Sequence, residues 1–276
     1  MSLVPRVERS PMLKKKSIQA WLSPEIFKWL YFSEEGGPYP CDEVACARPY
    51  EYLRHAEQLL RNGTDSMSRV DAISTLKRCL NHRLRYLKDT YALDKVPLPN
   101  WPKHLLDQMT ELGIVRPFLL KYLMKVRNQI EHADARPPSR PRCEELVDVL
   151  WYFLRSTDVF TKLECSRFWF QEPTSPHLWT YTVSFFVYPR RSWCIEVDGK
   201  LPSQWISTRR HPARMEIDCT TFERLERPPH IGHRRHRWNP TVIQFKGTVL
   251  GPPQAITKLM KLYFQPWFTQ EGSERK

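Results

Sequence analysis

The sequence predicts an α+β protein in which an antiparallel bundle of four or five helices is followed by a smaller β-rich domain. Residues 49–163 carry apolar side chains at three- and four-residue steps, the spacing of one face of an α-helix. Residues 164–276 instead carry short runs of β-branched and aromatic residues between turn signals. Helices that are joined by short loops pack antiparallel, so the first segment is expected to form the bundle.

Residues 1–48 are expected to form an N-terminal extension with one short helix. A polar, basic tail precedes a short apolar-periodic stretch at residues 18–32. Ser23 is followed by Pro24, and serine at the N-cap with proline at the first helical position favours a helix start. The stretch EEGGPYPCD at residues 34–42 then indicates a loop.

Start and stop signals divide residues 49–163 into five expected helices. The second of them is the longest, and the fourth cannot continue into residues 135–142 because that stretch (ARPPSRPR) is rich in proline. The expected spans are 49–61, about 66–91, 101–112, about 116–132 and 143–163.

Strands are expected in residues 164–276, which we predict to be a small, basic domain. Asp198-Gly199 has the composition of a tight hairpin turn. A short helix is expected at residues 253–263. The expected strands cover residues 168–170, 179–188, 193–197, 214–218 and 241–248.

The net charge of +13 favours a polyanionic partner, of which nucleic acid is the usual one. No apolar run reaches the roughly 18 residues of a membrane span, and the N-terminus has no secretory-signal pattern, so we expect a cytoplasmic protein without a membrane segment. The seven cysteines are odd in number and irregular in spacing, which favours free thiols over a disulfide framework. Cys41 and Cys46 have no second pair at zinc-site spacing, so no metal is expected there.

The stretch most informative about chemistry is LLKYLMKVRNQIEH, at residues 119–132. Asn128 directly follows Arg127, and four residues separate Arg127 from His132. This segment resembles the HEPN superfamily, whose helical bundles carry an arginine, a polar residue directly after it and a histidine a few residues later. The context is similar too, because the motif ends the fourth expected helix and an apolar helix follows. The resemblance covers about residues 49–163 and implies a HEPN-like helical domain.

Metal-free RNA cleavage requires a base, an acid and a cation. Histidine can serve as base or acid because its pKa lies near neutrality. Arginine keeps its charge and can engage two phosphate oxygens. On a helix, Asn128 and His132 stand four residues apart and share a face, with Arg127 beside them. Arg127 and His132 are therefore the candidate catalytic residues, with Asn128 supporting them.

The resemblance implies a metal-independent endoribonuclease that needs no cofactor. One histidine is too few for acid and base together, and HEPN ribonucleases bring two motif copies to one cleft, so the resemblance implies a homodimer. It also implies products with 2′,3′-cyclic or 3′-phosphate and 5′-hydroxyl ends. By analogy the role would be that of a toxin or an anti-phage effector, with an antitoxin or regulatory protein as a further partner.

Other interpretations remain open for the motif. Arg127 and Glu131 could simply form a helix salt bridge, and His132 could cap a helix C-terminus. The protein could also be a non-catalytic HEPN protein that binds nucleic acid or nucleotides, or a dimeric scaffold for a protein partner.

Basic residues outside the motif are candidates for holding RNA. Arg136, Arg140 and Arg142 follow the motif helix and could grip phosphates, although a solvated loop would have the same composition. The run HIGHRRHRW combines histidines and arginines with an aromatic ring, which suits single-stranded nucleic acid. Its histidine spacing lacks supporting cysteines or carboxylates, so we expect no metal there. The candidates in this run are Arg234, Arg235, Arg237 and Trp238.

Overall fold

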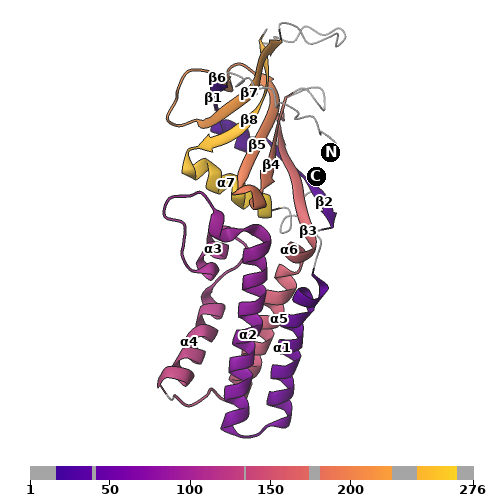
Figure 1. The fold of residues 1–276 in the computed structure, drawn as a ribbon, viewed down its shortest axis with the longest axis vertical. Coiled ribbons are helices and arrows are strands. Elements are labelled where there is room, and N and C mark those ends of the chain that lie inside the picture. Colours follow the sequence, from indigo (N-terminus) through magenta and orange to yellow (C-terminus); the bar gives the residue numbers. More distant parts are fainter. Residues whose placement is uncertain (1–16, 39–41, 134, 174–180, 226–240, 266–276) are drawn as a thin grey trace, which may run out of the picture.

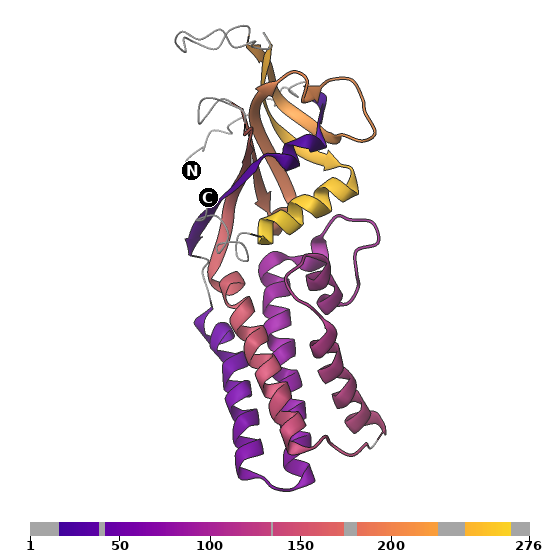
Figure 2. The same ribbon diagram turned by 180° about the vertical axis from the view of Figure 1, so that it is seen from behind.

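The computed structural model of the chain describes residues 17–38, 42–133, 135–173, 181–225 and 241–265. The molecule is elongated, with a group of long helices at one end and a twisted β-sheet at the other (Figure 1). The last helix lies across one face of the sheet, as the view from behind shows (Figure 2).

The two longest helices of the described residues begin at side-chain caps. Asp42 accepts hydrogen bonds from the backbone N–H groups of Val44 and Ala45, and Asp65 accepts one from Ser68 at 2.7 Å. The α-helices of the described residues are α1 (Glu43–Asn62), α2 (Ser66–Tyr91), α3 (Leu105–Glu111), α4 (Phe118–Ala133), α5 (Arg140–Thr157), α6 (Val159–Lys162) and α7 (Pro253–Phe264).

Helix α2 is the central helix of this part of the molecule, and its predicted span is confirmed. It packs against α1, α4 and α5. Its buried side chains recur at helical spacing, which explains why the periodicity of the sequence located it: they include Ala72, Ile73, Leu76, Leu80, Leu84 and Leu87.

Eight strands of the described residues form one sheet, and all neighbouring strands in it are antiparallel. The order across the sheet is β2-β3-β4-β5-β8-β7-β1-β6. The strands are β1 (Ile18–Leu22), β2 (Leu30–Pro38), β3 (Leu163–Gln171), β4 (Thr182–Tyr188), β5 (Cys194–Pro202), β6 (Ile206–Ser207), β7 (Met215–Leu225) and β8 (Val242–Gly251).

The predicted fold class, a helical bundle followed by a smaller β-rich domain, is wrong. The described residues form a mixed α/β fold with seven α-helices and one eight-stranded antiparallel sheet. The sheet takes β1 and β2 from the expected N-terminal extension, so its strands come from both sides of the helical segment. The predicted domain boundaries, which follow residues 48 and 163, stay predictions.

The helix expected within residues 18–32 is replaced by β1, the 3-10 helix η1 (Pro24–Lys28) and β2. Ser23 does act as an N-cap, accepting a hydrogen bond from the N–H of Glu25 at 3.3 Å, but only five residues become helical. Strands β1 and β2 lie toward opposite edges of the sheet, so the segment between them has to cross one face. Ile26 is buried on that face, and the ring of Phe27 packs edge-on against Phe170 with centroids 5.5 Å apart.

Helix α7 covers the same face of the sheet as η1 (Figure 2). The Tyr31 hydroxyl donates to the carbonyl of Leu262 at 3.0 Å, which fixes α7 against β2. The ammonium of Lys258 lies 4.2 Å from the centroid of the Phe27 ring. The buried residues of α7, among them Leu259 and Met260, complete this layer.

Aromatic residues join the helical part to the sheet. Phe264 at the end of α7 packs on Tyr91 of α2 and on Phe160 of α6, with ring centroids 5.1 and 5.6 Å apart. The Tyr91 hydroxyl donates to the carbonyl of Phe160 at 2.8 Å. The indole N–H of Trp193, next to β5, donates to the carbonyl of Ala92 at 3.3 Å. The two parts therefore share one continuous buried core.

The hairpin turn expected at Asp198-Gly199 is wrong, because both residues lie inside β5. Gly199 pairs with Val183 on one side and with Phe245 on the other. A Cβ at this position would lie 2.7 Å from Cε1 of Phe245. The glycine is therefore needed for the close approach of the Phe245 ring, not for a turn.

Two further expectations concern cysteines and membranes. Cys79, Cys143, Cys165, Cys194 and Cys219 are free thiols, but Cys46 is disulfide-bonded, so the expectation of free thiols is wrong for Cys46. Cys41 lies outside the described residues. In the described ranges, no helix combines the length and the apolar character that crossing a membrane requires.

Candidate functional site

Helix α4 carries the motif and is held in place by its apolar face. Leu120, Leu123 and Val126 are buried against the rest of the helical part. The helix begins with a hydrogen bond from the N–H of Lys121 to the carbonyl of Pro117 at 2.8 Å. The face on which Arg127 and Asn128 lie is consequently set by this buried stripe.

Arg127 and Asn128 form a contact of their own on α4. The guanidinium Nη1 of Arg127 donates to Oδ1 of Asn128 at 3.2 Å, and Asn128 is exposed. The backbone of His132 belongs to α4, whereas the side chains of Glu131 and His132 lie outside the described residues. The structure thus places two of the three motif side chains.

Lys77 of α2 is the residue near the motif that sequence reasoning missed. Burial, and after it the charge of Arg127, lower the pKa of Lys77. This shift means that a second cation from a neighbouring helix lies within electrostatic reach of Arg127. Two cations within electrostatic reach of each other are candidates for binding an anion such as phosphate.

The arginines that follow the motif helix have local partners. Arg136 is exposed. Arg140 and Arg142 lie in the first turn of α5, where Arg140 pairs with Glu144 at 3.0 Å and Arg142 pairs with Glu145. Arg142 also lies over the ring of Tyr122 at 4.8 Å. Since Tyr122 precedes Arg127 by more than one turn of α4, the structure does not bring Arg142 to the motif.

The other predicted RNA-binding residues, Arg234, Arg235, Arg237 and Trp238, lie outside the described residues. The same holds for the three histidines of that run. In the ranges that are described, no group of three or more histidine, cysteine, aspartate or glutamate residues could hold a metal ion.

A pocket of about 650 Å³ lies between α2, α3 and α4. Its apolar lining comes from Leu80, Leu84, Leu105, Leu106 and Met124, and its polar lining includes Asn81 and His104. At about 100° per residue, Lys77 falls on the stripe of α2 that faces the pocket, and Asn128 falls on the corresponding stripe of α4. Lys77 therefore lies about one helical turn from the pocket along α2, and Asn128 lies about one turn from it along α4.

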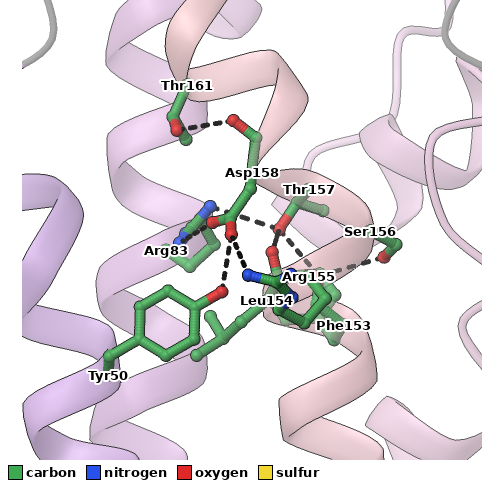
Figure 3. A network of polar contacts seen from close by, with 9 residues as sticks. All are labelled: Tyr50, Arg83, Phe153, Leu154, Arg155, Ser156, Thr157, Asp158 and Thr161. Carbon is green, nitrogen blue, oxygen red and sulfur yellow. Dashed lines mark hydrogen bonds and ion pairs between the residues drawn. The ribbon is translucent and has the colours of Figure 1, made fainter.

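A second cluster of ionisable groups, of which Arg83 is buried and the others are partly buried, lies between α1, α2 and the end of α5 (Figure 3). Nη2 of Arg83 lies 2.8 Å from Oδ1 of Asp158, and the Tyr50 hydroxyl donates to Oδ2 of the same carboxylate at 2.7 Å. Arg83 also donates to the Thr157 hydroxyl at 3.5 Å. The carboxylate is thus shared between Arg83 and Tyr50, with Arg155 a third partner at 3.8 Å, and the cluster links three helices.

The chemistry of this second cluster is structural. Burial, together with the hydrogen bond to Asp158, raises the pKa of Tyr50 to about 12, so the phenol keeps its proton at neutral pH. Burial is also the main cause that raises the pKa of the Cys79 thiol to about 12. Neither group is a base or a nucleophile under these conditions. The motif end of α4 is the better candidate site.

Relatives do not identify the site. Comparisons of the chain with protein-family models, with curated proteins and with solved structures find no match. Function is consequently inferred from the residues and their placement in the fold.

Proposed function

We propose that the chain is a metal-independent endoribonuclease of the HEPN type, with its site at the end of α4. Arg127 and His132 are the catalytic residues, and Asn128 is the supporting residue. The proposal adds Lys77 of α2 as a second phosphate-binding cation.

The observation that supports the proposal is the proximity of a second cation to the motif. The charge of Arg127 contributes to the lowered pKa of Lys77, so the two cations, which come from different helices, lie within electrostatic reach of each other. Two cations near each other favour the binding of an anion beside them. An RNA phosphate is an anion of the right kind, and the net charge of +13 favours association with RNA.

In this reaction the 2′-oxygen of one nucleotide attacks the adjacent phosphorus while the bond from phosphorus to the 5′-oxygen breaks. The proton of the 2′-hydroxyl goes to a base, and an acid gives a proton to the leaving 5′-oxygen. His132 of one protomer and His132 of its partner take these two roles in a homodimer. Arg127 and Lys77 offset the charge that develops on the non-bridging oxygens. The products are a 2′,3′-cyclic phosphate and a 5′-hydroxyl.

The biological setting that we propose follows the family resemblance alone. Such an enzyme acts in the cytoplasm as a toxin or an anti-phage effector, and a regulatory protein or antitoxin restrains it.

The test is cleavage of end-labelled RNA by the purified chain with EDTA present. We compare wild type with His132→Ala, Arg127→Ala and Lys77→Ala, and we use Arg54→Ala as the matched control. Arg54 is an exposed cation on α1, away from the motif helix. The proposal expects cutting with cyclic-phosphate ends that the first two substitutions abolish, that Lys77→Ala weakens at least tenfold and that Arg54→Ala leaves unchanged.

The alternative function is a non-catalytic HEPN protein that binds RNA phosphates at the same two cations. In that case wild type does not cut, RNA binds in a salt-dependent way, and His132→Ala keeps its affinity while Arg127→Ala loses it. Cutting that survives both His132→Ala and Arg127→Ala would place the active site elsewhere in the chain.

A further inference from the structure

The face of the sheet opposite α7 and η1 carries a polar hollow. Successive side chains of a strand point to opposite faces, so Ser184 of β4 lies on the other side of the sheet from its buried neighbours Val183 and Phe185. A hollow of about 410 Å³, which we call the sheet hollow, lies on the side of Ser184. Its lining comes from β3, β4, β5, β8 and β7, so it is separate from the site at α4.

The strand register places the polar residues of the sheet hollow in two adjacent rows. In one row, Asp198 of β5 is opposite Ser184 of β4 on one side and Lys246 of β8 on the other. In the next row, Lys200 of β5 is opposite Gln244 of β8. Side chains that are directly opposite have Cβ atoms about 4.5–5.5 Å apart, so these groups gather at one place on the sheet.

Positive charge exceeds negative charge in the lining of the sheet hollow. Arg167, Lys200 and Lys246 are its cations, and Asp198 is its carboxylate. Among the described residues, none of these four side chains has an ion-pair partner within 4.0 Å. Three positive charges against one negative charge favour an anionic ligand.

Arg167 is already held in place by its neighbours. Its Nη2 donates to the hydroxyl of Ser184 at 2.7 Å, and Ser184 is 1% exposed. Its guanidinium also lies over the rings of Trp169 and Phe186, at 5.1 and 5.6 Å from their centroids. Arg167 therefore forms a fixed wall, and the half-buried Lys200 and the exposed Lys246 are the cations that remain for a ligand.

Carboxylates surround the sheet hollow on the same face of the sheet. Glu196 lies two residues before Asp198 along β5, and Glu223 of β7 is opposite Gln244. Glu34 of β2 is opposite Arg167. A long polyanion that crossed this face would be repelled by them, whereas a small ligand with one anionic group would stay within the sheet hollow.

The other groups of the sheet hollow suit the hydroxyl groups of a sugar. Thr182, Thr221 and Gln244 each offer a donor and an acceptor, and the carboxylate of Asp198 accepts from hydroxyls. In the part of the chain that the structure describes, none of these four side chains forms a hydrogen bond with another residue. The volume lies in the range of roughly 300–1,000 Å³ that is typical of small-molecule sites. Strands β4 and β8 are two strands apart, roughly 10 Å, which is comparable to the length of a phosphorylated pentose.

We propose that the sheet hollow binds a phosphorylated sugar, with the phosphate between Lys200 and Lys246 and the sugar hydroxyls on Asp198 and Gln244. This site is independent of the proposed nuclease, because no residue of α2 or α4 lines it. Either proposal can therefore fail without the other.

The experiment measures binding of ribose 5-phosphate to the full chain by calorimetry at low salt, with inorganic phosphate and ribose as the two partial ligands. Lys200→Ala and Lys246→Ala each remove one cation, and Lys125→Ala makes the same change at an exposed position of α4. Asp198→Asn removes the carboxylate charge without changing the size of the side chain. Because these four residues are exposed or half-buried, the substitutions leave the core intact.

The proposal expects ribose 5-phosphate to bind at least tenfold more tightly than either inorganic phosphate or ribose. Lys200→Ala and Lys246→Ala each weaken this binding at least fivefold, and Lys125→Ala leaves it unchanged. Asp198→Asn weakens binding of ribose 5-phosphate at least threefold but does not weaken binding of inorganic phosphate, since a carboxylate repels the anion and holds the hydroxyls.

Three results would overturn the proposal. Equal binding of ribose 5-phosphate and inorganic phosphate would show that the sugar is not recognised. Absence of binding, or binding that both lysine substitutions in the sheet hollow leave unchanged, would show that this hollow is not the site. Binding of single-stranded RNA that these two substitutions weaken, in a chain that does not bind ribose 5-phosphate, would assign the surface to RNA instead of a small ligand.

Discussion

At the residue scale, Arg83 is a charged side chain that the fold holds almost wholly away from water. Its side chain is 1% exposed, and its guanidinium lies 2.8 Å from the carboxylate of Asp158. A buried ion pair adds little stability relative to well-packed apolar residues, because both ions lose hydration. Removing one partner is costly, since the other charge then stays buried without compensation.

The first prediction concerns this pair. We expect Asp158→Ala to lower the free energy of unfolding by about 3–5 kcal/mol, as measured by urea denaturation. The control is Arg155→Ala, which removes a 62% exposed arginine 3.8 Å from the same carboxylate. That change should stay within about 0.5 kcal/mol of wild type, as surface substitutions do. Equal losses for the two variants would contradict the role of burial.

The second prediction concerns the pH dependence of stability. Burial is the main cause that lowers the pKa of His82, and the charges of Arg48, Arg85 and Arg83 add to it, against the opposing charge of Asp42. The unfolded chain therefore binds a proton at His82 more readily than the folded chain. The contribution of His82 to the free energy of unfolding is present above the ordinary histidine pKa of 6.5. It is lost as the pH falls from 6.5 toward the lowered pKa of His82 in the folded chain.

We accordingly expect His82→Gln to lose less stability than wild type between about pH 7.5 and pH 5, because glutamine does not titrate. The measurement is the urea midpoint at each pH. His55→Gln, at an exposed position of α1, serves as the control and should follow wild type. Parallel curves for His82→Gln and wild type would show that His82 is not responsible.

Only part of the candidate site could be predicted from the sequence. Arg127 and Asn128 are adjacent in the sequence and belong to a recognisable motif, so no knowledge of the fold was needed to find them. Lys77 is far away in sequence, and only the packing of α2 against α4 brings it close. A signal did exist, because Lys77 interrupts an apolar stripe that contains Ile73 and Leu80.

At the element scale, α4 carries the motif but contributes little polar anchoring of its own. Its attachment depends on Leu120, Leu123 and Val126, of which Leu123 is fully buried. We expect Leu123→Ala to lower the free energy of unfolding by about 2–5 kcal/mol in urea denaturation, since the substitution leaves a cavity under the helix. Lys125→Ala on the exposed side of α4 should have almost no effect. A similar loss in the free energy of unfolding for both variants would mean that the packing of α4 is loose.

Helices were easier to predict than strands for a physical reason. A helix forms its hydrogen bonds locally, so the apolar spacing of residues 66–91 was enough to locate α2. Strand β1 pairs with β7, where Ile18 faces Cys219, and such distant pairing leaves no local signal. Gly199 was wrongly predicted to form a turn because Asp-Gly is a typical turn sequence. In the structure this glycine instead leaves room for the ring of Phe245.

At the scale of the whole molecule, the order of the strands explains why the fold class was predicted wrongly. The order of the predicted elements along the sequence suggests that the helices come first and that all the strands follow them. The sheet instead takes β1 and β2 from before the helices and places them toward opposite edges. The crossing segment η1 and helix α7 then share one face, so the two ends of the described chain complete a single layer (Figure 2).

This shared core leads to the last prediction, which concerns how the molecule unfolds. Phe264 contacts Tyr91 of α2, Phe160 of α6 and Trp193 beside β5, so one ring touches the helical part and the sheet. We expect wild type to lose helical circular dichroism and tryptophan fluorescence in one coincident urea transition, because neither part can open without exposing this cluster. Trp21 and Trp169 lie in strands β1 and β3, whereas Trp151 lies in α5, so the fluorescence reports on both parts and the circular dichroism mainly on the helices.

Phe264→Ala tests the coupling directly. The substitution removes a fully buried ring and should cost about 3–5 kcal/mol, and it should separate the two transitions because the parts then lose their common contact. Phe118→Ala is the matched control, since this phenylalanine is 80% exposed at the start of α4. Two separate transitions already present in wild type would mean that the helical part and the sheet are independent, and that the aromatic contacts between them add no cooperativity.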